Sequence, residues 1–196
     1  VLAFAWLWAQ VLLYGWSAWA TDQPILANHW VPEGFTYYLI YSCVNYWAHR
    51  LQHAWQPAWK YLHYMHHSPS HMESRVAFYR HPVELIANSF VLILTGKLLL
   101  NVSPEAIALS LTIEGSLATF HHSNKRYQKR IRQLGYVIQT PEQHLLHHQR
   151  GLHARTYSPI TLWDTIFGTV AFPAQSVQDL GFKDKGRAWP YLWFKQ

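Results

Sequence analysis

The chain has 196 residues, a length typical of a single domain with a sizeable core. Only 13% of its residues are charged, yet it holds 11 tryptophans and 12 tyrosines. This balance is unusual in soluble proteins and typical of membrane proteins, whose aromatic rings collect at the bilayer interfaces. The single cysteine, Cys43, excludes an internal disulfide framework and a cysteine-based zinc site.

Four apolar segments follow one another along the chain and predict an all-α membrane bundle of four transmembrane helices. Residues 1–19 carry no charge and are about as long as one membrane crossing. Residues 35–53 begin apolar and aromatic and end in a pair of histidines. The third and fourth segments are residues 83–100 and 105–122.

A short turn separates the last two segments, and its residues favour the start of a helix. Ser103 is a good N-cap, and Pro104 suits the first helical position. The third and fourth segments therefore predict one helical hairpin, and the first two predict another. The whole chain, residues 1–196, is then a single domain in which residues 54–82 and 123–196 form a helical cap.

The distribution of basic residues predicts which side of the membrane the cap occupies. Two hairpins place residues 49–81, and everything from residue 121 onward, on one side. Fifteen of the 16 Lys and Arg residues and thirteen of the 14 histidines fall there, Lys97 and His29 being the exceptions. Excess Lys and Arg marks the cytoplasmic side. We therefore expect an integral protein of a bacterial inner membrane or the endoplasmic reticulum, with its active site on the cytoplasmic side.

Clusters of histidines have the spacing of metal ligands. His49 and His53 form an H-x3-H motif, residues 63–67 and 144–148 each contain an H-x2-H-H motif, and His121-His122 lies between them. A helix places residues three and four apart on one face, so each cluster presents two or three imidazoles in one direction. This is more than one ion can use, and it predicts a site for two metal ions. Isolated histidines are expected to be structural: His29, His71, His81 and His153.

The net charge of +6 also raises the question of nucleic-acid binding. The densest basic run, residues 125–132, directly follows an apolar segment. In that position a basic cluster normally contacts anionic lipid headgroups. We therefore expect no nucleic-acid partner.

Six motifs occur in the order and spacing of a known family. They are YWAHRLQH (46–53), HYMHHS (63–68), RHPVE (80–84), FHHSN (120–124), TPEQHLLHH (140–148) and LWDTIFGT (162–169). Together they span nearly two thirds of the chain, which resembles the fatty acid hydroxylase/sterol desaturase superfamily of membrane di-iron enzymes. One departure leaves the substrate class open: the family often has Asn-Tyr-Gly where this chain has Thr156-Tyr157-Ser158.

The resemblance implies two iron ions, with dioxygen as co-substrate. Zinc or another transition metal could replace iron in recombinant protein, because affinity alone favours later transition metals. His122, rather than its neighbour His121, matches the histidine that precedes Ser-Asn in the family, and His121 stays open as the alternative ligand. The implied ligands are His49, His53, His63, His66, His67, His122, His144, His147 and His148.

Carboxylates are then expected to orient the ligating imidazoles by accepting their second ring N–H. Glu114 lies eight residues before His122, and a carboxylate within a membrane helix is a functional candidate by default. Glu84 and Asp164 are further candidates for this catalytic support. Two alternatives stay open: a loop or helix-cap role for Asp164, and a hydrogen bond remote from the metals for Glu114.

The resemblance further implies a lipid-like substrate and an external source of electrons. We expect the substrate in an apolar interior, with Trp47, Phe78, Phe90 and Phe120 as candidate lining. Because the sequence has no flavin, haem or iron–sulfur motif, a cytochrome b5- or ferredoxin-like donor is expected. The acidic face of such a donor would complement the basic cap.

Three functions remain open from the sequence. Oxygen-dependent hydroxylation of a fatty acyl, sterol or related lipid is the leading hypothesis. Desaturation at the same metal site is the nearest alternative, since both reactions begin with hydrogen abstraction. A non-catalytic metal-binding membrane protein is a hypothesis from another class, which predicts metal binding without oxygen consumption.

Overall fold

A computed structural model describes residues 29–96, 101–125, 129–174, 177, 179–182 and 188–195 of the chain. Within these residues the protein is helical, apart from one isolated antiparallel bridge between Gln149 and Leu180. The helices are α2 (Trp30–Ala54), α3 (Gln56–Ala58), the π-helix η1 (Trp59–His63), the 3-10 helix η2 (Ser74–Phe78), α4 (Pro82–Leu94), α5 (Pro104–His121), the 3-10 helix η4 (Lys129–Tyr136), α6 (Pro141–His147), α7 (Leu162–Ile166) and α8 (Ala188–Leu192).

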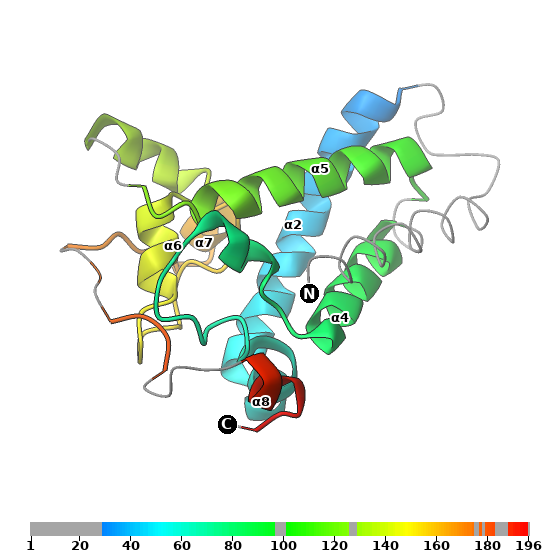
Figure 1. Cartoon of the computed structure of the whole chain (residues 1–196). Coiled ribbons are helices and arrows are strands. Elements are labelled where there is room, and N and C mark those ends of the chain that lie inside the picture. The colour runs from blue at the N-terminus through cyan, green and yellow to red at the C-terminus, as the bar shows by residue number, and fades with distance from the viewer. Residues whose placement is uncertain are drawn as a thin grey trace.

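Three long helices form the scaffold of the molecule. Figure 1 shows α5 lying across the amino-terminal half of α2, with α4 beside α2 and the short helices α6 and α7 near the carboxyl end of α5. The core between the long helices is built from Tyr37, Tyr38, Tyr41, Leu92, Val102, Ala106 and Ile107. The Tyr37 hydroxyl donates a hydrogen bond to the Leu92 carbonyl (2.7 Å), so this aromatic core also satisfies its polar atoms.

The crossing of α2 and α5 depends on a close approach at Gly34. A Cβ atom there would lie 2.7 Å from Leu109 Cδ2 and 3.2 Å from the Ala106 carbonyl oxygen, so a larger residue would push the helices apart. The Ser110 hydroxyl uses this approach to donate to the Gly34 carbonyl (3.0 Å). Beside it, the buried carboxylate of Glu33 accepts hydrogen bonds from both the amide and the hydroxyl of Ser103.

Helix caps fix where α4 and α5 begin. The predicted start of α5 is confirmed: Pro104 is its first residue, and the Ser103 hydroxyl accepts a hydrogen bond from the Ala106 amide (3.3 Å). Helix α4 begins at Pro82, where Nδ1 of His81 accepts from the Val83 amide (3.1 Å). His81 is therefore a capping residue, which fits the structural role expected for it.

The predicted membrane segments correspond only in part to the described helices. The segments 35–53 and 105–122 fall on α2 and α5, and 83–100 overlaps α4, although residues 97–100 lie outside the described part. The segment 1–19 lies wholly outside it. In the described part of the chain, no helix combines the length and the apolar character needed to cross a bilayer, so the four-span prediction is unconfirmed.

Candidate metal centre

The nine histidines named from the sequence come together in two adjacent groups. The first group comprises His49, His53, His63, His67 and His147, and the second comprises His66, His122, His144 and His148. Within each group one ring nitrogen from every residue lies within 4.8 Å of all the others. His67 and His148 stack with ring centroids 4.1 Å apart, so the two groups share a wall.

Five chain segments supply these rings, each for a local reason. His49 and His53 are one helical turn apart on α2 and therefore share a face. His63 ends the π-helix η1, and His66 and His67 lie in the turn that follows it. His122 is the C-cap of α5. Helix α6 carries the last three, with His148 at its C-cap.

The Nε2 atoms in the first group approach one another closely. His63 Nε2 lies 2.8 Å from that of His49 and 3.1 Å from that of His67, and His53 Nε2 lies 3.2 Å from that of His49. Two imidazole nitrogens bound to one ion at right angles, each about 2.1 Å from it, are separated by about 3 Å. The observed separations therefore have the size expected for ligands of a common ion.

The second group shows the same convergence. His122 Nε2 lies 2.9 Å from that of His144 and 3.4 Å from that of His66. The rings of His148 and His66 have centroids 4.8 Å apart. Four buried imidazoles thus face a common centre, one from the turn after η1, one from α5 and two from α6.

Oxygen acceptors around the groups orient five of the rings. Nδ1 of His49 contacts the Tyr157 carbonyl (2.5 Å), and Nδ1 of His66 contacts that of Tyr79 (3.3 Å). Nδ1 of His122 and of His147 contact the carbonyls of Ala118 and Arg155, and Nδ1 of His63 contacts Glu84. A carbonyl or carboxylate only accepts, so each Nδ1 carries the proton and donates. The Nε2 lone pair is then left facing the centre, as in metal-bound histidine.

Burial keeps the imidazoles neutral. Six of them, three from each group, have a pKa lowered well below the ordinary value of 6.5. The first cause is burial, which disfavours the charged form, and the second is repulsion from neighbouring groups that are or could become positively charged. They are His63, His66, His67, His144, His147 and His148. Neutral imidazole is the form that binds a metal ion.

The unsatisfied atoms of the site fit a metal ion. Nε2 of His147 and Nε2 of His148 are buried without a hydrogen-bond partner among the described residues. Where Nδ1 carries the proton, facing Nε2 atoms are all acceptors, and acceptors about 3 Å apart repel one another. A cation at each centre removes both problems, so the donor set suits two nitrogen-ligated transition-metal ions.

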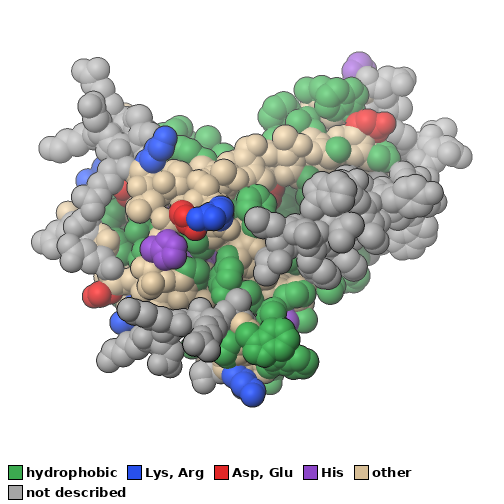
Figure 2. Space-filling view, in the orientation of Figure 1, with side chains coloured by type: hydrophobic (Ala, Val, Ile, Leu, Met, Phe, Trp, Pro, Cys, Tyr) green, Lys and Arg blue, Asp and Glu red, His purple; other side chains and the backbone are tan. Residues whose placement is uncertain are grey.

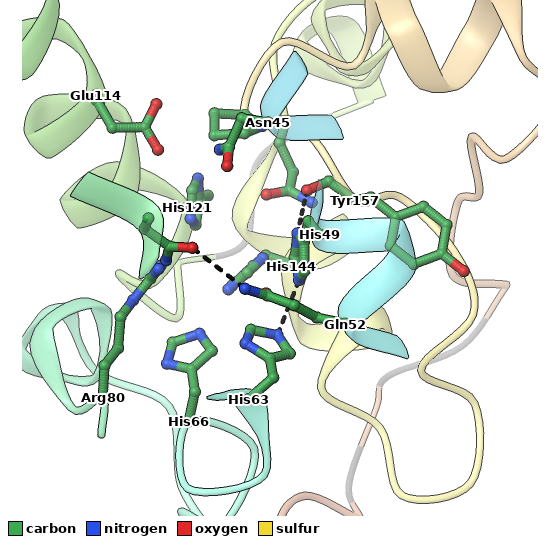
Figure 3. A pocket seen from close by; sticks show the side chains of 13 residues that line it. Asn45, His49, Gln52, His63, His66, Arg80, Glu114, His121, His144 and Tyr157 are labelled. Carbon is green, nitrogen blue, oxygen red and sulfur yellow. Dashed lines mark hydrogen bonds between the residues drawn. The ribbon is translucent and has the colours of Figure 1, made fainter. Parts of the chain in front are cut away.

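The carboxylates expected to support the ligands differ in position. The Glu84 side chain is fully buried, and its Oε1 accepts from His63 Nδ1 (2.9 Å) and lies 3.4 Å from Arg80 Nη1. Glu114 instead accepts from the Tyr38 hydroxyl (2.8 Å), and Figure 3 shows its carboxylate facing a cavity. Of the two, Glu84 holds the position that the sequence argument gave first to Glu114.

Asp164 acts through a loop rather than on a histidine. It accepts from the amides of Tyr157 (2.7 Å) and Ser158 (2.9 Å) and from the Thr169 hydroxyl (2.6 Å). These contacts hold the loop whose Tyr157 carbonyl orients His49, which agrees with the loop role left open for Asp164. Burial raises the pKa of Asp164, and its hydrogen bonds oppose that rise.

The same loop contains the departure from the family motif. Thr156 has a φ of +52°, in the left-handed region where asparagine is common and a β-branched residue is strained. The family's Asn-Tyr-Gly motif places asparagine at this position. Here Thr156 is fully buried, and its hydroxyl accepts from the Ala171 amide (3.0 Å), which compensates in part for the strain.

Two further histidines lie beside the groups without joining them. The buried ring of His121 lies 4.1 Å from the ring of His144, and its Nδ1 is unpartnered among the described residues. His153 lies 4.8 Å from the ring of His67 and is half-buried, with Nδ1 3.3 Å from the His147 carbonyl oxygen. His71 and His29 are exposed, away from both groups.

Sequence reasoning missed the polar residues beside the histidines. Asn45, Gln52 and Asn88 line a cavity at the metal groups, and Gln52 donates to Asn88 (3.2 Å). The signal was present as helical spacing, because Asn45, His49 and Gln52 lie four and three residues apart. Of the aromatic residues expected to line an apolar interior, Trp47, Phe78 and Phe90 are exposed and do not line this cavity.

Comparison with known families agrees with this geometry. The model of the fatty acid hydroxylase family matches residues 34–169, a stretch that contains all nine clustered histidines. The chain belongs to the fatty acid hydroxylase family. Members of this family are oxidoreductases of lipids and are generally membrane-associated. Searches of curated proteins and of solved structures find no match.

Proposed function

We propose that this fatty acid hydroxylase family member is a membrane non-haem di-iron monooxygenase that hydroxylates a lipid-like substrate, with electrons from an external donor. The convergence of nine histidines into groups of five and four carries the proposal. The outward Nδ1 hydrogen bonds support it, because they leave the Nε2 atoms free to bind two ions.

Under this proposal His49, His53, His63, His67 and His147 hold one ion and the other four histidines hold the second. Bound iron would supply the activation of dioxygen, chemistry that no side chain provides. The chain's own residues orient the imidazoles, exclude water from buried rings and position the substrate. Glu84 keeps the His63 ring in place, and the loop held by Asp164 does the same for His49.

Exposed apolar side chains support the membrane location that we propose. On α4, Ile86, Phe90 and Leu94 are 41%, 61% and 42% exposed and lie at four-residue spacing, so they form one stripe. Figure 2 shows hydrophobic side chains gathered at the amino end of α2 and over α8, where Trp189 and Trp193 are more than 60% exposed. Contiguous exposed apolar surface of this kind suits contact with lipid.

Product analysis tests this function against its alternatives. Iron-loaded protein with a ferredoxin or cytochrome b5 reducing system and isotopically labelled dioxygen should convert a component of a membrane lipid extract to a product with one labelled oxygen. Loss of two hydrogens without oxygen gain would favour the desaturase. Reduced, fully iron-loaded protein that consumes no oxygen with any lipid fraction would favour a non-catalytic metal-binding protein.

A further inference from the structure

A cavity adjoins both histidine groups and reaches the place where a substrate would react. It is lined by His49 and His63 of the first group and by His66 and His144 of the second. Figure 3 shows these rings along one side of the cavity, with Glu114, Asn45 and Arg80 around the remainder. Whatever part of a substrate lies here would sit next to the metal ions of the proposed function.

The lining of this cavity is polar, which is unexpected for a lipid enzyme. Among the described residues that line it, Pro159 alone lacks a polar side-chain atom. Besides imidazoles and Tyr157 the lining comprises Asn45, Gln52, Arg80, Asn88, Glu114 and Gln139. Pockets for apolar ligands are lined mainly by hydrophobic and aromatic side chains. A bare hydrocarbon placed here would desolvate many polar groups without giving them partners.

Two charged residues in the lining retain hydrogen-bonding capacity. Arg80 donates from Nε to the Ala77 carbonyl (3.1 Å) and from Nη1 to Glu84 (3.4 Å). Its Nη2 donors have no hydrogen-bond partner among the described residues. Glu114 uses Oε2 for the Tyr38 hydroxyl, which leaves Oε1 as an acceptor. The cavity thus offers a free donor from one element and a free acceptor from another.

We propose that this cavity binds a neutral polar group of the substrate, a hydroxyl or an amide, which donates to Glu114 and accepts from Arg80. The inference rests on the proposed function, in which the adjacent histidines hold the metal ions. The substrate class is then a lipid alcohol or lipid amide that is oxidised close to its polar group. The carboxamides of Asn45 and Asn88 offer further donors and acceptors around that group.

The residues of the lining disfavour two other substrate groups at this position, a carboxylate and a hydrocarbon end. A carboxylate would pair with Arg80, but Arg80 already donates to Glu84, and a carboxylate has no hydrogen to donate to the acceptor oxygen of Glu114. A hydrocarbon end would satisfy neither residue. A site that hydrogen-bonds a substrate hydroxyl or N–H rejects analogues that lack it far more strongly than an apolar pocket rejects a change of shape.

Equilibrium binding to the full chain tests the proposal without turnover. Zinc-loaded protein in detergent, which holds metal but is redox-inert, is titrated with radiolabelled 1-hexadecanol. Hexadecane, hexadecanamide and hexadecanoate then compete at equal mole fraction in the micelles. We expect the affinity for the alcohol and the amide to be at least about tenfold higher than that for the hydrocarbon and the carboxylate. A factor of this size corresponds to one hydrogen bond to a charged group.

Two variants tie the preference to the Glu114 carboxylate. Glu114→Leu should lower alcohol binding about tenfold and leave hydrocarbon binding unchanged or stronger. Tyr38→Phe removes the same Tyr38–Glu114 hydrogen bond but keeps the carboxylate, so the alcohol preference should remain. Zinc content, measured for every sample, verifies that the histidine groups are intact.

The outcomes separate this inference from the proposed function. Equal binding of hydrocarbon and alcohol, or tightest binding of hexadecanoate, would overturn the inference even if two metal ions are bound. Protein that binds no metal but prefers the alcohol would contradict the proposed function and leave the polar-group site standing. Should Glu114→Leu fail to fold, the ligand series on the unaltered protein decides alone.

Discussion

The carboxyl group of Glu84 holds one of the candidate metal ligands, His63, in place. Glu84 Oε1 accepts from His63 Nδ1 at 2.9 Å, and the side chain is fully buried. Glu84→Gln replaces the carboxyl acceptor with a weaker carboxamide acceptor, so the His63 ring is held less firmly and becomes less basic. We expect metal affinity to fall about ten- to a hundredfold. Competition of the apoprotein with a chromophoric chelator measures this change.

Glu114→Gln provides the matched comparison. Its carboxylate contacts Tyr38 and the cavity rather than a histidine, so metal affinity should stay within about threefold of the unaltered protein. Equal weakening by Glu84→Gln and Glu114→Gln would show that the contact with His63 is not what matters.

Residue types in the metal centre were easier to predict than their partners. The nine clustered histidines were all named from spacing and family resemblance, because helical periodicity places such residues on one face. Of their acceptors only Glu84 was among the candidates, because the others are main-chain carbonyls, such as those of Tyr157, Tyr79 and Arg155, which carry no side-chain signature. Glu114 was favoured over Glu84 because of its sequence distance to His122. That distance, however, says nothing about contacts between helices.

Helix α6 brings three of the nine histidines to the centre and is only seven residues long. A capping box fixes its start: the Thr140 hydroxyl accepts from the Gln143 amide, and the Gln143 side chain accepts from the Thr140 amide (2.9 Å). Thr140→Ala should cost about 1 kcal/mol of unfolding free energy and weaken metal binding. Chemical denaturation and metal titration measure the two effects.

Ser103→Ala is the matched control, because it removes a helix cap that is remote from the metal groups. Ser103 caps the end of α5 that is opposite to His122, and its hydroxyl also donates to the buried Glu33. Its loss should therefore destabilise the fold by at least as much as Thr140→Ala and leave metal affinity unchanged. If both variants weakened metal binding equally, global destabilisation rather than the placement of α6 would explain the effect.

At the level of elements, helices with strong local signals were placed along the sequence, whereas the cap was predicted only as a region, without its individual helices. Ser103-Pro104 marked the start of α5, and the segments 35–53 and 105–122 fall on α2 and α5. The π-helix η1 and the left-handed Thr156 arise from tertiary packing around the histidines, which no local pattern encodes. Glu33 is buried against Ser103, and this contact joins residues 70 positions apart in the chain, which no local pattern indicates.

The concentration of neutral histidines makes the metal-free molecule sensitive to acid. Six buried histidines, His63, His66, His67, His144, His147 and His148, have a folded-state pKa well below 6.5, whereas in the unfolded chain they take up protons near that value. Below about pH 6.5 the unfolded state therefore binds more protons, and the free energy of unfolding falls as the pH is lowered.

Urea denaturation of chelator-treated protein between pH 8 and pH 5 measures this dependence. We expect little change above about pH 7 and a progressive loss of stability below about pH 6.5, up to about 1.4 kcal/mol per pH unit for each histidine that becomes protonated on unfolding. Stability that is flat or rises toward pH 5 would mean that these imidazoles are not buried and neutral in the folded protein.

The central claim is that the molecule holds two metal ions, one in each histidine group. Metal analysis of the purified full chain tests it most directly, together with His67→Ala in the first group, His148→Ala in the second and the exposed His71→Ala as control. We expect about two ions per chain in the unaltered protein and in His71→Ala, and a clearly lower metal content in each of the other two variants. A folded, unaltered protein that binds one ion or none when metal is in excess would contradict it.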